Sequence, residues 1–258
     1  MSTSAWRGWF ARGLGAALAM VAAMWAAPAA AADVSVAVAA NFTEPAKEIA
    51  AAFDRATGHH AVLSFGASGQ FYAQIAHGAP YQVFLSADTE RAQKVEADGL
   101  AVPGSRFTYA TGRLVLYSRT LGLVDARGAV LHEAGRFQKL AIADPAAAPY
   151  GAAAVETLGT LGLYAGLKPK IVQGSSISQA YQFAATGAAE LGFVALSQVI
   201  AVPGGSRWIV PETLHRPIDQ GAVLLKTGAN DPAARAFVAF LKGPQAKAII
   251  RRYGYQVR

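Results

Sequence analysis

Apolar and polar positions along the chain alternate between two periods. Val34–Ala39 places larger apolar residues at every second position, which is the period of a β-strand. From Thr43 onward the apolar residues recur at helical spacing, and Gly58 is typical of a helix end. A strand that leads directly into a helix is the unit from which α/β folds are built.

The same two periods repeat to the end of the chain. Further strands are predicted at Ala61–Phe65, Gln82–Ser86, Thr111–Tyr117, Leu140–Ala143, Lys170–Gln173, Leu191–Val194 and Ala222–Lys226. Helices are predicted around Phe71 and Ile75 up to Gly78, from Thr89 to Gly99, and over Gly151–Leu163, Ser178–Ala185, Pro232–Lys242 and Pro244–Tyr253. This alternation predicts parallel sheets that are covered by helices on both faces. We expect two α/β lobes, the first over residues 33–112 and the second over residues 113–221.

The first 32 residues have the pattern of a cleavable signal peptide. Arg7 and Arg12 form a basic start, and Gly13–Ala27 is an apolar run shorter than the roughly 20 residues that span a bilayer. Small residues precede Asp33 and suit cleavage. The alternative is an N-terminal membrane anchor. A cleaved signal predicts a soluble exported protein, located in the periplasm.

Composition narrows the classes of partner. The chain has 23 Lys and Arg, of which two lie in the first 32 residues, against 16 Asp and Glu, so the mature chain carries a net charge of +5. The basic residues form no run longer than Arg251–Arg252, which argues against nucleic acid. No cysteine is present, which excludes disulfides and a lipid-anchored lipoprotein. A diffuse positive charge can still steer small anions towards the protein.

Four strand-to-helix turns share one chemical character. None contains Lys, Arg, His, Asp or Glu, and each brings backbone N–H groups to the start of a helix. Ligands of open α/β sheets collect beyond the carboxyl ends of strands, where such turns lie. The turns are Ala40–Thr43, Gly66–Gln70, Pro145–Gly151 and Gly174–Ser178.

Helix starts that point at one place form a site for an anion without any cationic side chain. The first N–H groups of a helix lack partners, and the helix dipole adds about half a positive charge there. Two turns come from each predicted lobe, so we expect the anion in the cleft between the lobes, with a hinge motion on binding. A site made of donors suits a fully deprotonated dianion, because a protonated one brings an O–H that needs an acceptor.

Other interpretations of these residues remain open at this stage. Asn41, Ser68 and Ser175 are also typical helix N-caps, and Ile177 is also a plausible core residue. A different class of function is a secreted hydrolase with Ser68 or Ser176 as the nucleophile, although the chain lacks a G-x-S-x-G elbow.

Metal and nucleotide chemistry have little support in the sequence. His59 and His60 follow a helix end and are predicted to lie in an exposed turn, without the further ligands that a metal site needs. His77, His132 and His215 stand alone and are predicted at the surface. No phosphate-binding P-loop is present, so the energy for any transport must come from partner subunits.

Five segments resemble the periplasmic molybdate-binding proteins of ABC transporters, the ModA family. They are AVAANFTEPAKEIAAAF, LSFGASGQFYAQIAHGAPYQVFLSAD, LAIADPAAAPYGAAAVETL, ELGFVALSQV and FLKGPQAKAIIRRYGY. The resemblance runs from about Val34 to the C-terminus. It implies a two-lobe type II periplasmic binding protein fold with mixed, mostly parallel sheets. It also implies that residues 222–258 return to the first lobe.

The resemblance further implies a ligand and a set of binding residues. The ligand would be molybdate, with tungstate as a near-isosteric analogue, and sulfate or another small oxyanion is the alternative within this class. The family's oxygen-binding positions correspond to Ala40, Asn41, Ser68, Tyr150 and Ile177. Ala195 stands where some members carry a Tyr hydroxyl, which Tyr150 would supply here. We therefore expect a monomeric receptor without cofactor, bound metal cation or catalytic residues, which delivers its ligand to an ABC permease and its ATPase subunit.

Overall fold

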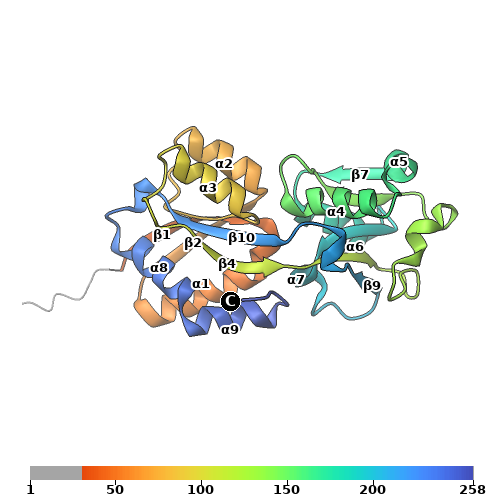
Figure 1. The fold of residues 1–258 in the computed structure, drawn as a ribbon. Coiled ribbons are helices and arrows are strands. Elements are labelled where there is room, and N and C mark those ends of the chain that lie inside the picture. The colour runs from red at the N-terminus through yellow and green to blue at the C-terminus, as the bar shows by residue number, and fades with distance from the viewer. Residues whose placement is uncertain (1–30, 258) are drawn as a thin grey trace, which may run out of the picture. The chain divides into compact units, whose positions relative to one another are not determined.

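The structure is a computed structural model that describes residues 31–257, so the predicted signal peptide lies almost wholly outside the described residues. Two five-stranded sheets form the framework, and the chain visits them in turn (Figure 1). In each sheet one strand runs antiparallel to the other four. The prediction of mixed, mostly parallel sheets is therefore confirmed.

The first sheet has the strand order β2-β1-β3-β10-β4, and β10 is the antiparallel strand. Alternate residues of β1 enter two different cores, because successive side chains of a strand point to opposite faces. Val36 and Val38 pack with the helices α1, α8 and α9, whereas Ala37 packs with α2 and α3. The elements of this part are β1 (Asp33–Ala39), η1 (Ala40–Phe42), α1 (Thr43–Thr57), β2 (His60–Gly66), α2 (Ser68–Ala76), β3 (Val83–Leu85), α3 (Thr89–Ala97), β4 (Phe107–Gly112), β10 (Ile218–Leu224), η6 (Lys226–Gly228), α8 (Pro232–Lys242) and α9 (Pro244–Arg252).

The second sheet has the strand order β7-β6-β8-β5-β9, in which β5 is the antiparallel strand. Its faces are again separated by strand alternation. Leu114 and Leu116 of β5 enter the core that contains α4, whereas Val115 and Tyr117 pack with α7. The elements of this part are β5 (Leu114–Ser118), η2 (Ala129–His132), η3 (Ala134–Arg136), β6 (Leu140–Ala143), α4 (Pro149–Thr160), α5 (Tyr164–Leu167), η4 (Lys168–Lys170), β7 (Ile171–Gly174), α6 (Ile177–Thr186), β8 (Leu191–Ala195), α7 (Leu196–Val199), β9 (Ser206–Ile209) and η5 (Glu212–Leu214).

The chain passes between the two sheets at two places. It leaves the first sheet after β4 and enters the second at β5, and it returns from β9 to β10. The sequence predicted a single strand over Thr111–Tyr117, and this prediction is wrong. Gly112 ends one strand and Leu114 begins another in the other sheet, because apolar alternation alone does not show where a chain changes sheets. The residue boundaries of two lobes stay a prediction.

Three short elements and two histidines also differ from the expectations. The sequence did not predict α5, α7 and β9, which are only four residues each. His59 and His215 were expected at exposed positions, but both are buried. The His59 ring accepts a hydrogen bond from the backbone N–H of Ala32, and the His215 ring donates to the carbonyl of Arg216. The partner of His59 lies 27 positions away in the chain, which local sequence does not reveal.

Within residues 31–257, every helix is too short or too polar to cross a bilayer.

Candidate functional site

The four turns singled out in the sequence meet at one pocket between the two sheets. From the first sheet come the residues that follow β1, β2 and β3, and from the second come the residues that follow β6 and β7. All of these strands present their carboxyl ends to the pocket, as expected for ligand sites of open α/β sheets. The lining residues are Ala39, Ala40, Asn41, Gly66, Ala67, Ser68, Ala87, Ala148, Pro149, Tyr150 and Ile177.

Three helices begin at this pocket. Ser68 is the first residue of α2, Ile177 is the first residue of α6, and Tyr150 follows the Pro149 that opens α4. Pro suits the first position because its missing N–H would have no helical partner there. The first N–H groups of each helix lack carbonyl partners within the helix, and the aligned peptide dipoles make these ends positive. The convergence of three such ends favours a bound anion.

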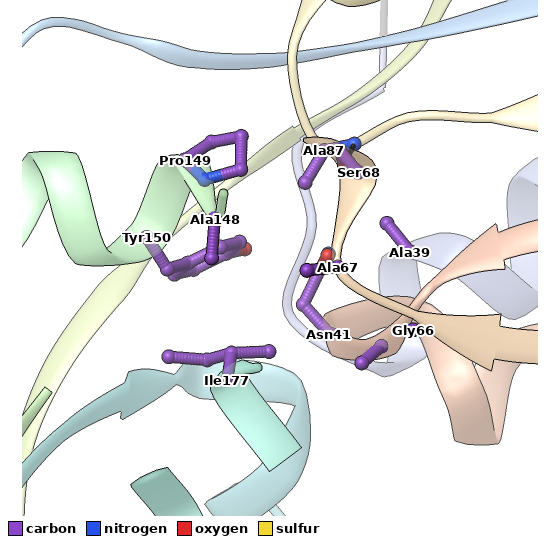
Figure 2. Close-up of a pocket in the computed structure, with 11 residues that line it drawn as sticks. Ala39, Asn41, Gly66, Ala67, Ser68, Ala87, Ala148, Pro149, Tyr150 and Ile177 are labelled. Carbon is purple, nitrogen blue, oxygen red and sulfur yellow. Dashed lines mark hydrogen bonds between the residues drawn. The ribbon is translucent and has the colours of Figure 1, made fainter. Parts of the chain in front are cut away.

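The structure brings together all five residues that the sequence proposed as ligand contacts. Ala40, Asn41, Ser68, Tyr150 and Ile177 line the pocket, and all five are buried. Figure 2 shows Tyr150 and Ile177 on one side of the space and Asn41 and Ser68 on the other. Their role as ligand contacts stays a prediction.

The pocket is small and uncharged. None of the described residues that line it carries a formal charge. Its cavity volume is about 10 Å³, so it admits only a small ligand. Arg91 does not line the pocket. Its guanidinium donates to the carbonyl of Ala146 at 2.6 Å and forms an ion pair with Asp88. A bulky or organic ligand does not fit the pocket as it stands.

Hydrogen bonds join the two sides around the pocket. The N–H of Gly69 donates to the carbonyl of Ala147 at 2.9 Å, directly between the second and third turns. The hydroxyl of Ser178 donates to the carbonyl of Ala40 at 3.4 Å, between the fourth turn and the first. The two sides of the cleft are therefore in contact in this structure.

The alternative that Asn41, Ser68 and Ser175 are helix N-caps is not supported. Phe42 caps α1, Ala67 caps α2 and Ser176 caps α6, and of these only Ser176 uses its side chain, which accepts from the N–H of Gln179. The hydroxyl oxygen of Ser68 instead accepts a hydrogen bond from the N–H of Ala87 at 2.9 Å. An N–H can only donate, so the Ser68 proton remains available for an acceptor in the pocket.

A buried hydrogen-bond network lies behind Asn41 and was not predicted from the sequence. The side-chain amide of Asn41 donates to Gln220 Oε1 at 2.9 Å and to the hydroxyl of Tyr255 at 3.0 Å. The hydroxyl of Tyr109 also donates to Gln220 Oε1, at 2.8 Å. These residues lie far apart in the sequence. The sequence offers one signal for this network, the polar Gln220 in a strand that is otherwise largely apolar, because a buried amide requires hydrogen-bond partners.

The network is neutral because its tyrosines keep their protons. Burial is the main cause that raises the pKa of Tyr109 and of Tyr150 well above the usual value of 10. Burial likewise raises the pKa of Tyr255, to about 12, although its hydrogen bonds with Ser197 and Asn41 act against it. At neutral pH these hydroxyls can therefore donate protons and place no negative charge beside the pocket.

The buried tyrosines predict a loss of stability in alkali. Because the pKa of Tyr255 is higher in the folded state, the unfolded chain releases this proton first as the pH rises. The stability that protonated Tyr255 contributes to folding is therefore complete below about pH 10 and is lost towards about pH 12. We expect the free energy of unfolding, from urea titrations at pH 8, 9.5 and 11, to fall above pH 10. In the Tyr255→Phe variant the free energy of unfolding should fall less steeply with pH, by up to about 1.4 kcal/mol per pH unit. Equal slopes in both proteins would contradict the prediction.

Comparisons with known proteins agree with this geometry. Residues 34–256 match the family model of the bacterial extracellular solute-binding proteins. The molybdate-binding protein ModA of Rhodobacter capsulatus is 60% identical over 239 residues, which cover 93% of this chain and 94% of that protein. The chain belongs to the bacterial extracellular solute-binding proteins, in the ModA family. The family resemblance drawn from the sequence is thus confirmed.

Solved structures place this solute-binding protein in the same fold. The periplasmic molybdate-binding protein of Azotobacter vinelandii is 45% identical and superposes with a TM-score of 0.84, over 87% of this chain and 99% of that one. The sulfate-binding protein SubI of Mycobacterium tuberculosis is 14% identical, with a TM-score of 0.71 over 88% of this chain and 87% of that one, and so shares the fold alone. The expected type II periplasmic binding protein fold is confirmed.

Family membership also decides between the two classes of function. Solute-binding proteins bind and release their ligand. The prediction of a binding protein is therefore confirmed, and the alternative of a secreted hydrolase is not. Ser176, one of the two serines considered as a nucleophile, caps α6.

Proposed function

We propose that this solute-binding protein captures molybdate, and also tungstate, for uptake by an ABC transporter. The observation that carries the proposal is the pocket itself, in which three helix starts and two hydroxyls converge without a charged side chain. Its chemistry suits a small dianion, whose charge is met by N–H and O–H donors. The ModA proteins of Rhodobacter capsulatus and Azotobacter vinelandii, named as molybdate-binding, support the choice of ligand.

Each predicted residue has a distinct role in this proposal. Ala40 and Ile177 offer only their backbone N–H groups, whereas Ser68 and Tyr150 add a hydroxyl proton. Asn41 acts through its backbone as well, because both protons of its side-chain amide are already donated to Gln220 and Tyr255. The sequence left side-chain donation by Asn41 open, and the observed hydrogen bonds favour the backbone.

The setting of the protein in the cell belongs to the same proposal. The family is extracellular, and the predicted signal peptide would place the mature chain in the periplasm. The partners would be a molybdate permease and its ATPase subunit. Two lobes, residues 33–112 with 222–258 and residues 113–221, would close on the anion as a monomer, and the closed form would dock on the permease.

Selectivity within the oxyanions would depend on size and protonation. Sulfate has the same charge and tetrahedral shape as molybdate but is smaller, so a cage fitted to molybdate leaves sulfate with longer and weaker hydrogen bonds. Phosphate carries a proton at neutral pH, and that proton finds few acceptors among these donors.

Calorimetric titration of the mature protein with four oxyanions tests the proposal. We expect tight binding of molybdate and tungstate, and much weaker binding of sulfate and phosphate. The melting temperature should rise more with molybdate and tungstate than with sulfate and phosphate, because a ligand that binds only the folded state stabilises it. Preferential binding of sulfate or phosphate would refute molybdate as the ligand.

A further inference from the structure

We infer that Gln220 is a positioning residue of the anion site, whose side-chain amide sets the direction in which the Tyr150 hydroxyl donates its proton. The inference rests on the proposed function and adds a residue to it. Gln220 lies in β10, next to an irregularity in the pairing of that strand with β4. It is fully buried and is absent from the residues that line the pocket. Any effect on the ligand must therefore pass through its neighbours.

The direction of the hydrogen bonds can be derived from one backbone carbonyl. The carbonyl oxygen of Asn41 lies 2.7 Å from the hydroxyl of Tyr255 and 2.7 Å from the hydroxyl of Ser197. A carbonyl only accepts, so both hydroxyl protons point to it. Ser197 Oγ also lies 3.0 Å from the Tyr255 hydroxyl, so the single proton of Tyr255 is used on the carbonyl and Ser197 side. Towards the side chain of Asn41 the Tyr255 oxygen therefore acts as an acceptor.

This requirement orients the side chain of Asn41 and, through it, that of Gln220. The Asn41 side chain lies 3.0 Å from the Tyr255 oxygen, so the atom that faces Tyr255 must be the amide nitrogen. The second proton of that nitrogen is donated to Gln220 at 2.9 Å, so the atom of Gln220 that faces Asn41 must be its oxygen. Tyr109 donates to the same oxygen. The amide nitrogen of Gln220 is consequently on its other side.

That nitrogen faces the hydroxyl of Tyr150. Gln220 Nε2 lies 3.4 Å from the Tyr150 oxygen and can only donate to it, so the Tyr150 proton must point elsewhere. Two acceptors remain: the oxygen of Tyr255, which interacts with this hydroxyl, and an anion in the pocket. An anion is the stronger acceptor, because charged hydrogen bonds are roughly twice as strong as neutral ones. Figure 2 shows the oxygen end of Tyr150 on the side of the space that faces Asn41.

Two further observations fit this assignment. Both atoms pack against Gly112, where a Cβ would lie 2.0 Å from the Tyr150 oxygen and 2.7 Å from Gln220 Nε2, so the absence of a side chain at this position gives the pair its place. Ser68, the other hydroxyl of the pocket, also accepts from an N–H behind it, that of Ala87. Both hydroxyl oxygens therefore accept from a donor outside the pocket, and a bound anion competes for the Tyr150 proton only with the oxygen of Tyr255.

A double-mutant cycle tests the role of Gln220. Gln220→Met keeps the length of the side chain and removes its polar atoms, and Tyr150→Phe removes the hydroxyl through which Gln220 is inferred to act. In calorimetric titrations with molybdate, Gln220→Met should weaken binding at least about fivefold when Tyr150 is present and less than about twofold in the Tyr150→Phe background. A purely structural role of Gln220 predicts the same loss in both backgrounds, and that result would overturn the inference.

A second variant separates hydrogen-bond direction from packing. Gln220→Glu keeps the shape of the side chain but presents an acceptor to Tyr150 and adds a negative charge beside a dianion. We expect Gln220→Glu to bind molybdate more weakly than Gln220→Met does. If Gln220→Met does not fold, Gln220→Glu by itself tests the role of Gln220. Binding of Gln220→Glu as tight as that of the wild type would also overturn the inference.

A matched control is available at the far end of β3. Gln82 accepts from the N–H of Ser35 at 2.8 Å, before β3 begins, whereas the pocket lies beyond its other end. Gln82→Met should lower the melting temperature and leave molybdate affinity unchanged. The titration of the wild type distinguishes a failure of the proposed function from a failure of the inference about Gln220. Without molybdate binding in the wild type the proposed function and the inference both fail, whereas binding without coupling in the cycle refutes only the inference.

Discussion

Replacement of Gly151 by Ala is expected to destabilise the protein and to abolish tight molybdate binding. Gly151 lies in the first turn of α4, where a Cβ would be 2.2 Å from the carbonyl oxygen of Ala143 and 2.8 Å from its carbon. Both are backbone atoms at the end of β6, so the contact can be relieved only by a shift of the helix. Overpacking of this kind costs about 1–3 kcal/mol, and sometimes more. The same shift would move Tyr150, the residue before it, away from the pocket.

The same helix supplies the control for this substitution. Gly159 lies in α4 as well, and a Cβ there would meet no atom within 4 Å. Gly159→Ala should therefore stabilise the protein by about 0.5–1 kcal/mol, the usual gain from Gly to Ala inside a helix. Urea unfolding measures both stabilities and calorimetry measures both affinities. The proposed clash would be refuted by a Gly151→Ala variant that matched Gly159→Ala in both.

Loss of either hydroxyl in the pocket is the second large effect expected. Ser68→Ala and Tyr150→Phe should each weaken molybdate binding by roughly 1–3 kcal/mol, the cost of losing a hydrogen bond to a charged group. Both hydroxyl oxygens accept a hydrogen bond from behind the pocket, Ser68 from the N–H of Ala87 and Tyr150 from Gln220 Nε2, so each can donate its own proton to a bound anion. Calorimetric titration of the two variants gives these losses directly.

Two substitutions outside the pocket serve as matched controls. Tyr72 donates to Asp98 on the surface, and Ser105 bonds to the backbone of Leu224. Tyr72→Phe and Ser105→Ala remove the same chemical groups as Tyr150→Phe and Ser68→Ala do, and should leave the affinity unchanged. Unchanged affinity in both pocket variants would mean that the ligand binds elsewhere.

Regular elements of the fold were predictable where local sequence decides them. Leu140–Ala143 and Pro232–Lys242 have the predicted bounds, and the helix from Thr43 ends at Gly58 as expected. Gly58 adopts a positive φ of 75°, a conformation that glycine adopts without steric cost. Apolar periodicity, a Pro at the helix start and a Gly at its end are local signals, so no knowledge of the tertiary structure was required.

The four turns of the site were also within reach of the sequence, and the resemblance to the ModA family selected the five proposed contacts within them. They follow strands at the starts of helices, and the fold class predicts that such turns gather at one edge of each sheet. The arrangement of the turns around one pocket agrees with that expectation. The change of sheets at Gly112 and the burial of His59 and His215 were missed, because these depend on segments distant in the chain.

The sequence by itself determined the alternation of strands and helices, the uncharged character of the four turns and membership of a binding-protein family. Only the tertiary structure decided which way the donors point. The direction of the Tyr150 hydroxyl depends on Gln220, which is 70 positions away, and that of Gln220 on Asn41, 179 positions away. A hydrogen bond has a direction that both partners must satisfy, and in a buried network each partner is chosen by folding rather than by neighbouring sequence.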